Sequence, residues 1–158
     1  MRILLVCLGN ICRSPTAEAA LREALAGAGM DGQVTVDSAG TGDWHIGQPP
    51  DRRMAAAAAA AGLRLDGRAR IIRADDFEAF DLILVMDRSN LEDVLALAPT
   101  PQGREKVRLF RAFDPDADHD EVPDPYYGGA DGFTRVVGIT RAAARGVVRY
   151  LQQQELPA

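Results

Sequence analysis

The chain has 158 residues, a net charge of −5 and 47% hydrophobic residues, values that fit one domain with a single buried core. No stretch reaches the roughly 18–20 apolar residues of a membrane span. The acidic charge and the lack of a basic stripe argue against a nucleic-acid partner. The apolar run after Arg2 is too short for an export signal, so we expect a cytoplasmic protein without a membrane partner. Two cysteines do not make a disulfide framework.

The first third of the chain predicts strand, helix, strand and loop. Residues 2–8 form an apolar run typical of a parallel strand that is buried on both faces. Helical spacing of apolar residues follows, with Ser14 as the expected N-cap and Gly29 as the expected stop. Residues 33–38 indicate a second strand, and the Gly, Asp and Pro residues of 40–50 indicate a long loop.

The rest of the chain continues this alternation. We expect a helix over 51–61, a strand over 82–86, a helix capped by Asp87 to about 98, a strand over 107–110, an acidic loop over 114–125 and a helix over 130–153. Such alternation predicts an α/β fold with a parallel sheet, and the lack of repeats and linkers predicts one domain over 1–158. Ligands bind beyond the carboxyl ends of such strands, so the loop after the first strand is the first candidate site.

That loop carries the residues of an anion site and of a nucleophile. It reads Cys7-Leu8-Gly9-Asn10-Ile11-Cys12-Arg13-Ser14 and opens a helix, whose N–H groups and dipole form an anion cradle. Gly9 and Asn10 tolerate the left-handed backbone angles that a tight loop needs. Arg13 offers a planar fork for two phosphate oxygens, and the same groups would stabilise a thiolate at Cys7. A cysteine at a strand end is more often a small buried hydrophobe, but this setting favours the functional interpretation.

Five segments together resemble the low-molecular-weight protein tyrosine phosphatase family: CLGNICRS, SPTAEA, SAGTGDWHIGQPPD, MDRSN and VPDPYYGG. They extend from the first strand to the start of the last helix. The resemblance implies a four-stranded parallel sheet in the order 2-1-3-4, flanked by helices on both faces, and hydrolysis of phosphotyrosine with no metal or other cofactor. It implies Cys7 as nucleophile, Arg13 as phosphate clamp, Asp124 as general acid, Ser14 as donor to the thiolate, and Asn10 as the residue that shapes the loop with help from Ser38.

The sequence departs from the family at Gly67, where many members have a histidine that helps to fix the loop asparagine. We therefore expect a looser or water-filled network around Asn10, without loss of activity.

The acid and the walls of the site come from two other loops. A phenolate leaves poorly unless it is protonated, so an acid is required. Asp124 differs from the other loop carboxylates because Pro125 restricts its backbone and two tyrosines follow. The pattern Asp114-x-Asp116-x-Asp118 lacks the glycine and glutamate of a calcium loop.

A flat aryl ring would fit a slot, and its depth would favour phosphotyrosine over the shorter phosphoserine. We expect Trp44, Tyr126 and Tyr127 as its walls and Ile11 as its floor, with His45 at the rim. Asp87, besides capping a helix, is expected to orient Arg13. The loop residues that would contact the substrate are Leu8, Gly9, Asn10, Ile11, Cys12 and Ser14.

Oxidation of an activated Cys7 is expected to yield a disulfide with Cys12, which would make the enzyme redox-regulated. Three other functions remain open. A thiol-coupled arsenate reductase would need further cysteines after Cys12, and a protein arginine phosphatase favours threonine where Ile11 stands and lacks the tyrosine pair. A phosphate-sensing domain would not need Cys7 and Asp124 together.

The expected partners are phosphotyrosyl proteins, with inorganic phosphate as product. The alanine- and arginine-rich composition looks bacterial, and by analogy with bacterial relatives one such partner is a tyrosine kinase of polysaccharide export.

Overall fold

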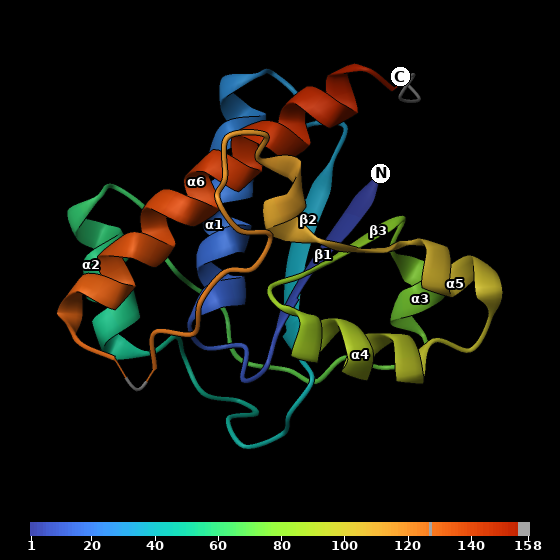
Figure 1. Cartoon of the computed structure of the whole chain (residues 1–158), viewed down its shortest axis with the longest axis horizontal. Coiled ribbons are helices and arrows are strands. Elements are labelled where there is room, and N and C mark those ends of the chain that lie inside the picture. Colours follow the sequence, from blue (N-terminus) through green and yellow to red (C-terminus); the bar gives the residue numbers. More distant parts are fainter. Residues whose placement is uncertain (127, 155–158) are drawn as a thin grey trace.

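Four strands form one parallel sheet, which gives the site its scaffold (Figure 1). The computed structural model describes residues 1–126 and 128–154. The strands are β1 (Arg2–Cys7), β2 (Thr35–Gly40), β3 (Leu82–Val85) and β4 (Val107–Leu109). Their order is β2-β1-β3-β4, and each neighbouring pair is parallel. The expected sheet and its order are therefore confirmed.

Helices cover both faces of the sheet, because the side chains of β1 are apolar on both faces and must be buried. Ile3 and Leu5 belong to a core shared with helices on one face, whereas Leu4 and Val6 belong to a second core on the other face. The first core is built with α1 (Arg13–Gly27), α2 (Arg52–Ala60) and α6 (Ala130–Gln152), and the second with α3 (Asp76–Ala79) and α4 (Arg88–Leu97). None of the helices within 1–126 and 128–154 has the length and apolarity needed to cross a bilayer.

Three short elements were not predicted from sequence: α3, α5 (Pro101–Glu105) and the 3-10 helix η1 (Phe110–Phe113). Each has at most five residues, too few to show a helical period.

The expected N-cap at Ser14 was wrong, because α1 begins at Arg13 and Cys12 occupies the cap position without a side-chain hydrogen bond. The Ser14 hydroxyl is bonded instead to the loop before the helix, as described below. The helix ends at Gly27, and Gly29 follows with a φ of 71°.

Close backbone approach brings β2 against the loop that follows β1. A Cβ atom at Gly40 would lie 2.7 Å from the carbonyl oxygen of Leu8, so no larger residue fits there without a shift. The far side of Gly40 pairs with the segment after α2, since its N–H donates to the Arg70 carbonyl at 2.8 Å and its carbonyl accepts from Ile72 at 2.8 Å. This pairing brings residues 70–72 to the carboxyl ends of β1 and β2.

Candidate active site

The loop after β1 curls around the sulfur of Cys7. Asn10 has a φ of 57°, which makes it the non-glycine residue with a left-handed backbone in the described chain, whereas Gly9 does not adopt a positive φ. The N–H group of Asn10 donates to Cys7 Sγ at 3.3 Å. This amide thus turns toward the sulfur, next to the start of α1, where the first N–H groups have no intrahelical acceptor. This arrangement favours negative charge at the sulfur.

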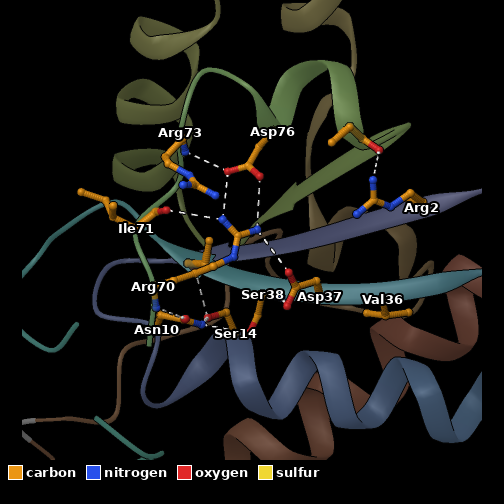
Figure 2. Close-up of polar contacts among 12 residues, drawn as sticks. Arg2, Asn10, Ser14, Val36, Asp37, Ser38, Arg70, Ile71, Arg73 and Asp76 are labelled. Atoms are coloured by element: carbon orange, nitrogen blue, oxygen red, sulfur yellow. Dashed lines mark hydrogen bonds and ion pairs between the residues drawn. The ribbon is translucent and has the colours of Figure 1, made fainter. Parts of the chain in front are cut away.

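The Asn10 side chain connects the loop to its surroundings (Figure 2). Its amide nitrogen donates to Ser14 Oγ at 2.8 Å and to Ser38 Oγ at 3.0 Å, while its oxygen accepts from the backbone N–H of Arg70 at 3.0 Å. Because Ser14 accepts from Asn10, its own proton is left for Cys7 Sγ at 3.1 Å or the Ala39 carbonyl at 3.4 Å. The shorter contact favours donation to a Cys7 thiolate.

Gly67 leaves the direct contacts of Asn10 in place and opens space beside them, so that of our expectation of a looser or water-filled network the structure shows room for water and no loss of these bonds. Ser14, Ser38 and Arg70 together satisfy both polar atoms of the Asn10 amide. Gly67 adopts a φ of 84° and lines a cavity of about 190 Å³ that Asn10 also borders. The histidine expected from the family pattern is thus replaced by space rather than by a new contact to Asn10.

Arg13 is buried, with 3% of its side chain exposed, and is held from one side. Its Nη1 donates to Asp87 Oδ2 at 2.6 Å and to the Val122 carbonyl at 3.0 Å. Burial alone would lower the pKa of Arg13, but the neighbouring Cys7, Asp87 and Asp124 raise it above its ordinary value, so the guanidinium stays charged. With both Nη1 hydrogens engaged, Nε and Nη2 remain as the pair of donors for a bidentate anion.

Asp124 approaches the other terminal nitrogen of this guanidinium, Nη2. Its Oδ2 is 3.6 Å from Arg13 Nη2, and its Oδ1 accepts from the backbone N–H of Tyr126 at 3.0 Å. The side chain is 39% exposed, so the carboxyl group can exchange protons with solvent. The bond to Tyr126 aims the carboxylate, in addition to the restriction by Pro125.

A pocket of about 340 Å³ lies between the loop and Asp124. Trp44, 68% exposed, and Tyr126 lie on its rim and wall, and Ile11, 6% exposed, lines it from the protein side. His45 also lines the pocket, and its ring centroid is 6.1 Å from that of Tyr126. The residues that line the pocket are Cys7, Leu8, Gly9, Ile11, Cys12, Arg13, Trp44, His45, Asp124 and Tyr126.

The second cysteine shares the pocket but differs in its environment. Cys7 and Cys12 are both free and buried. Burial, with Asp51 and Cys7 close by, raises the pKa of the Cys12 thiol to about 12. Cys12 therefore stays protonated at neutral pH.

Three residues around the pocket were missed in the sequence, because their contacts join distant segments. Arg53 donates to the Tyr126 carbonyl at 3.1 Å and lies over its ring, with 5.3 Å from the guanidinium carbon to the centroid. Val122 accepts from Arg13, and Arg70 holds Asn10. No periodicity or motif marks these contacts, although VPDP does place Val122 near the acid.

The geometry does not test two expectations, namely Tyr127 as a wall of the slot and hydrolysis without a metal ion. Tyr127 lies outside the described residues. Within 1–126 and 128–154, no group of three His, Cys, Asp or Glu side chains is placed so that it could hold a metal ion.

Comparison with known proteins gives one consistent result. The family model described as low molecular weight phosphotyrosine protein phosphatase matches residues 2–156. A low molecular weight protein-tyrosine-phosphatase of Streptomyces coelicolor is 44% identical over 155 residues, which are 97% of this chain and 94% of that protein. A phosphotyrosine protein phosphatase of Schizosaccharomyces pombe is 44% identical over 84% of this chain and 85% of its own. The crystal structure of an Entamoeba histolytica protein tyrosine phosphatase with Hepes in its active site superposes with a TM-score of 0.94, at 38% identity and 97% coverage of both chains.

Proposed function

Since the chain belongs to the low molecular weight phosphotyrosine protein phosphatase family, we propose that it hydrolyses phosphotyrosine and small aryl phosphates through a cysteinyl-phosphate on Cys7. As a member of this family it is a protein-tyrosine-phosphatase. The observation that carries the mechanism is that Cys7, Arg13 and Asp124 line one pocket, with Asp124 3.6 Å from Arg13.

In the first step the phosphate dianion binds to Nε and Nη2 of Arg13 and to the loop N–H groups. The Cys7 thiolate attacks phosphorus in line, so that the S–P bond forms as the bond to the phenolic oxygen breaks. Asp124, protonated at this stage, gives its proton to the leaving oxygen, and tyrosine departs. The hydrogen bonds from Ser14 Oγ at 3.1 Å and Asn10 N at 3.3 Å support the thiolate before attack.

In the second step Asp124, now a carboxylate, takes a proton from water, and the oxygen attacks phosphorus. The S–P bond breaks, which releases inorganic phosphate and restores the thiolate. Arg13 and the loop N–H groups stabilise the charge on the equatorial oxygens in both steps, so that the mechanism needs no metal ion.

The pocket rim supports an aromatic substrate. Trp44 and Tyr126 offer aromatic faces beside a phosphate cradle that lies deeper in the pocket. Phosphotyrosyl proteins, a bacterial tyrosine kinase among them, are therefore the proposed partners, in the cytoplasm. The Cys7–Cys12 disulfide is the proposed redox response. Peroxide oxidises the Cys7 thiolate to a sulfenic acid; Cys12 then gives up its proton and attacks the Cys7 sulfur, so that the S–S bond forms as the S–O bond breaks and water leaves.

The test is a turnover panel of phosphotyrosine, phosphoserine and phosphoarginine peptides, with arsenate as a further substrate. Release of phosphate from the phosphotyrosine peptide alone is the expected result. Preference for phosphoarginine, or reduction of arsenate with added thiol, would replace the proposal by one of the two alternatives.

A further inference from the structure

Arg111 is a buried charged residue that no step above uses. It lies in η1 and is 8% exposed, and it does not line the pocket. Its Nη1 donates to the carbonyl of Glu121 at 2.9 Å and its Nη2 to Asp118 Oδ1 at 3.0 Å. Its Nε is buried and has no partner among the described residues. A guanidinium that is buried despite an unbonded nitrogen calls for a specific role.

The segment that Arg111 holds leads directly to the acid. The residue after Glu121 is Val122, which is fully buried, and its N–H donates to the Met86 carbonyl at 2.7 Å. The Val122 carbonyl in turn accepts from Arg13 at 3.0 Å. Asp124 follows two residues later. Arg111, the Met86 carbonyl just after β3, and Arg13 thus fix three successive points of the backbone from which Asp124 projects.

The carbonyl contact, rather than the ion pair, is what Arg111 contributes. Asp118 is 80% exposed, and exposed pairs are weak. The same holds for Arg88, 60% exposed, which binds Asp120 in the same loop. The Glu121 carbonyl, by contrast, receives a charged donor from a side chain that is almost fully buried.

The backbone that carries Arg111 is itself fixed by close packing of η1 on α6. A Cβ atom at Gly146 of α6 would come within 1.9 Å of the carbonyl oxygen of Phe113, so the two elements meet at backbone distance. The segment that leads from η1 to Asp124, gold to orange in Figure 1, therefore starts from a closely packed support.

We propose that Arg111 is a positioning residue for Asp124: by holding the Glu121 carbonyl it sets the distance from the acid to the leaving oxygen. This inference rests on the proposed function, in which Asp124 protonates the leaving group. A displaced acid slows the departure of poor leaving groups and leaves phosphate binding nearly unchanged, because the cradle belongs to the loop after β1 and Arg13 keeps its bond to Asp87.

The experiment measures kcat/KM of the full chain for a series of aryl phosphates with leaving groups from nitrophenol to phenol. For Arg111→Met we expect a loss of about tenfold with phenyl phosphate and less than threefold with nitrophenyl phosphate, since an acid contributes most to poor leaving groups. The inhibition constant of inorganic phosphate should stay within about twofold of wild type. Arg111→Lys keeps one charged donor and packs similarly, so it should show a smaller effect in the same direction. This variant provides the test if Arg111→Met does not fold.

Asp118→Asn and Arg88→Met are the matched controls: the first removes the ion pair of exposed Asp118, and the second removes the exposed ion pairs of Arg88 with Asp120 and the Glu121 side chain. Both should behave like wild type, because both keep the bond from Arg111 to the Glu121 carbonyl. Asp124→Ala separates the two proposals. If the loss of kcat/KM in Asp124→Ala is the same for all leaving groups, the acid assignment fails. If that loss grows with poorer leaving groups but the losses in both Arg111 variants do not, only the positioning role fails. In the Asp124→Ala background, Arg111→Met should cost no more than about twofold with phenyl phosphate, because no acid remains to be misplaced. An equal loss for all substrates, or weaker phosphate binding, would also overturn the role of Arg111.

Discussion

Asp87 serves two elements with its two oxygens, and its replacement should affect both stability and phosphate binding. Oδ1 caps α4 by accepting from Asn90 N at 2.7 Å, and Oδ2 accepts from Arg13 Nη1 at 2.6 Å. The sequence predicted the cap and the contact with Arg13. The perturbation is Asp87→Ala, which removes both, set beside Asp87→Asn, which keeps a good capping oxygen and removes the charge.

The magnitude follows from burial. Loss of an N-cap costs about 1 kcal/mol. Breaking a buried ion pair costs about 3–5 kcal/mol, but Asp87 is 23% exposed and Arg13 keeps the Val122 carbonyl, which favours about 2–3 kcal/mol here. Asp87→Ala should therefore lower the free energy of unfolding by about 3–4 kcal/mol, or roughly 6–16 °C in Tm for a chain of this size. Asp87→Asn should lose only the part due to the pair, about 2–3 kcal/mol.

The assay combines thermal or urea unfolding with the inhibition constant of inorganic phosphate. Phosphate should bind at least about tenfold more weakly to both variants, since Arg13 loses the partner that aims its fork, and each 1.4 kcal/mol is tenfold in binding. Thr100→Ala is the matched control, because the Thr100 side chain caps α5 through Gly103 N at 3.0 Å and lies away from the pocket. It should cost about 1 kcal/mol and leave phosphate binding unchanged. If Asp87→Ala costs no more than Thr100→Ala, or binds phosphate as wild type does, the account of Arg13 is refuted.

Three further outcomes follow from the pocket. Trp44→Ala should reduce kcat/KM for aryl phosphates by about tenfold and inorganic phosphate binding by less than twofold, because stacking contacts reach the ring and not the phosphate; equal losses would make Trp44 structural. Iodoacetamide at pH 8 should label Cys7 and spare Cys12, whose pKa of about 12 keeps it a thiol, and peptide mass spectrometry would reveal labelling of Cys12 as the contrary result. After peroxide treatment, dithiothreitol should restore the activity of wild type well and that of Cys12→Ser poorly. Equal recovery of the two would mean that Cys12 has only a packing role.

The architecture was predictable because its signals are local. Apolar runs of strand length and helical spacing between them predict the alternation, and the loop after β1 follows from parallel topology. The strand order, however, came from the family resemblance, since pairing between β1 and β3 joins segments about eighty residues apart, as in the register Ile3 with Leu82.

The sequence predicted which residues would share one pocket better than it predicted their contacts. Cys7, Arg13 and Asp124 stand in recognisable motifs, and the structure brings all three to one pocket. The role of the Ser14 hydroxyl was mistaken in part, because a serine before an apolar period is usually a cap, and only the folded loop shows its contact with Asn10. The bond from Arg13 to Val122 spans 109 residues, and no local pattern announces such a contact.

The central claim is that phosphate is transferred to the sulfur of Cys7. The most direct measurement is to mix the enzyme with a phosphotyrosine peptide, quench in acid within one turnover, and locate the phosphate by mass spectrometry, with Cys7→Ser as the control. The account predicts a phosphate adduct on Cys7 that disappears as substrate is exhausted, together with a Cys7→Ser variant that binds phosphate and has no turnover. Substantial turnover by Cys7→Ser, or a phosphate adduct on any other residue, would contradict it.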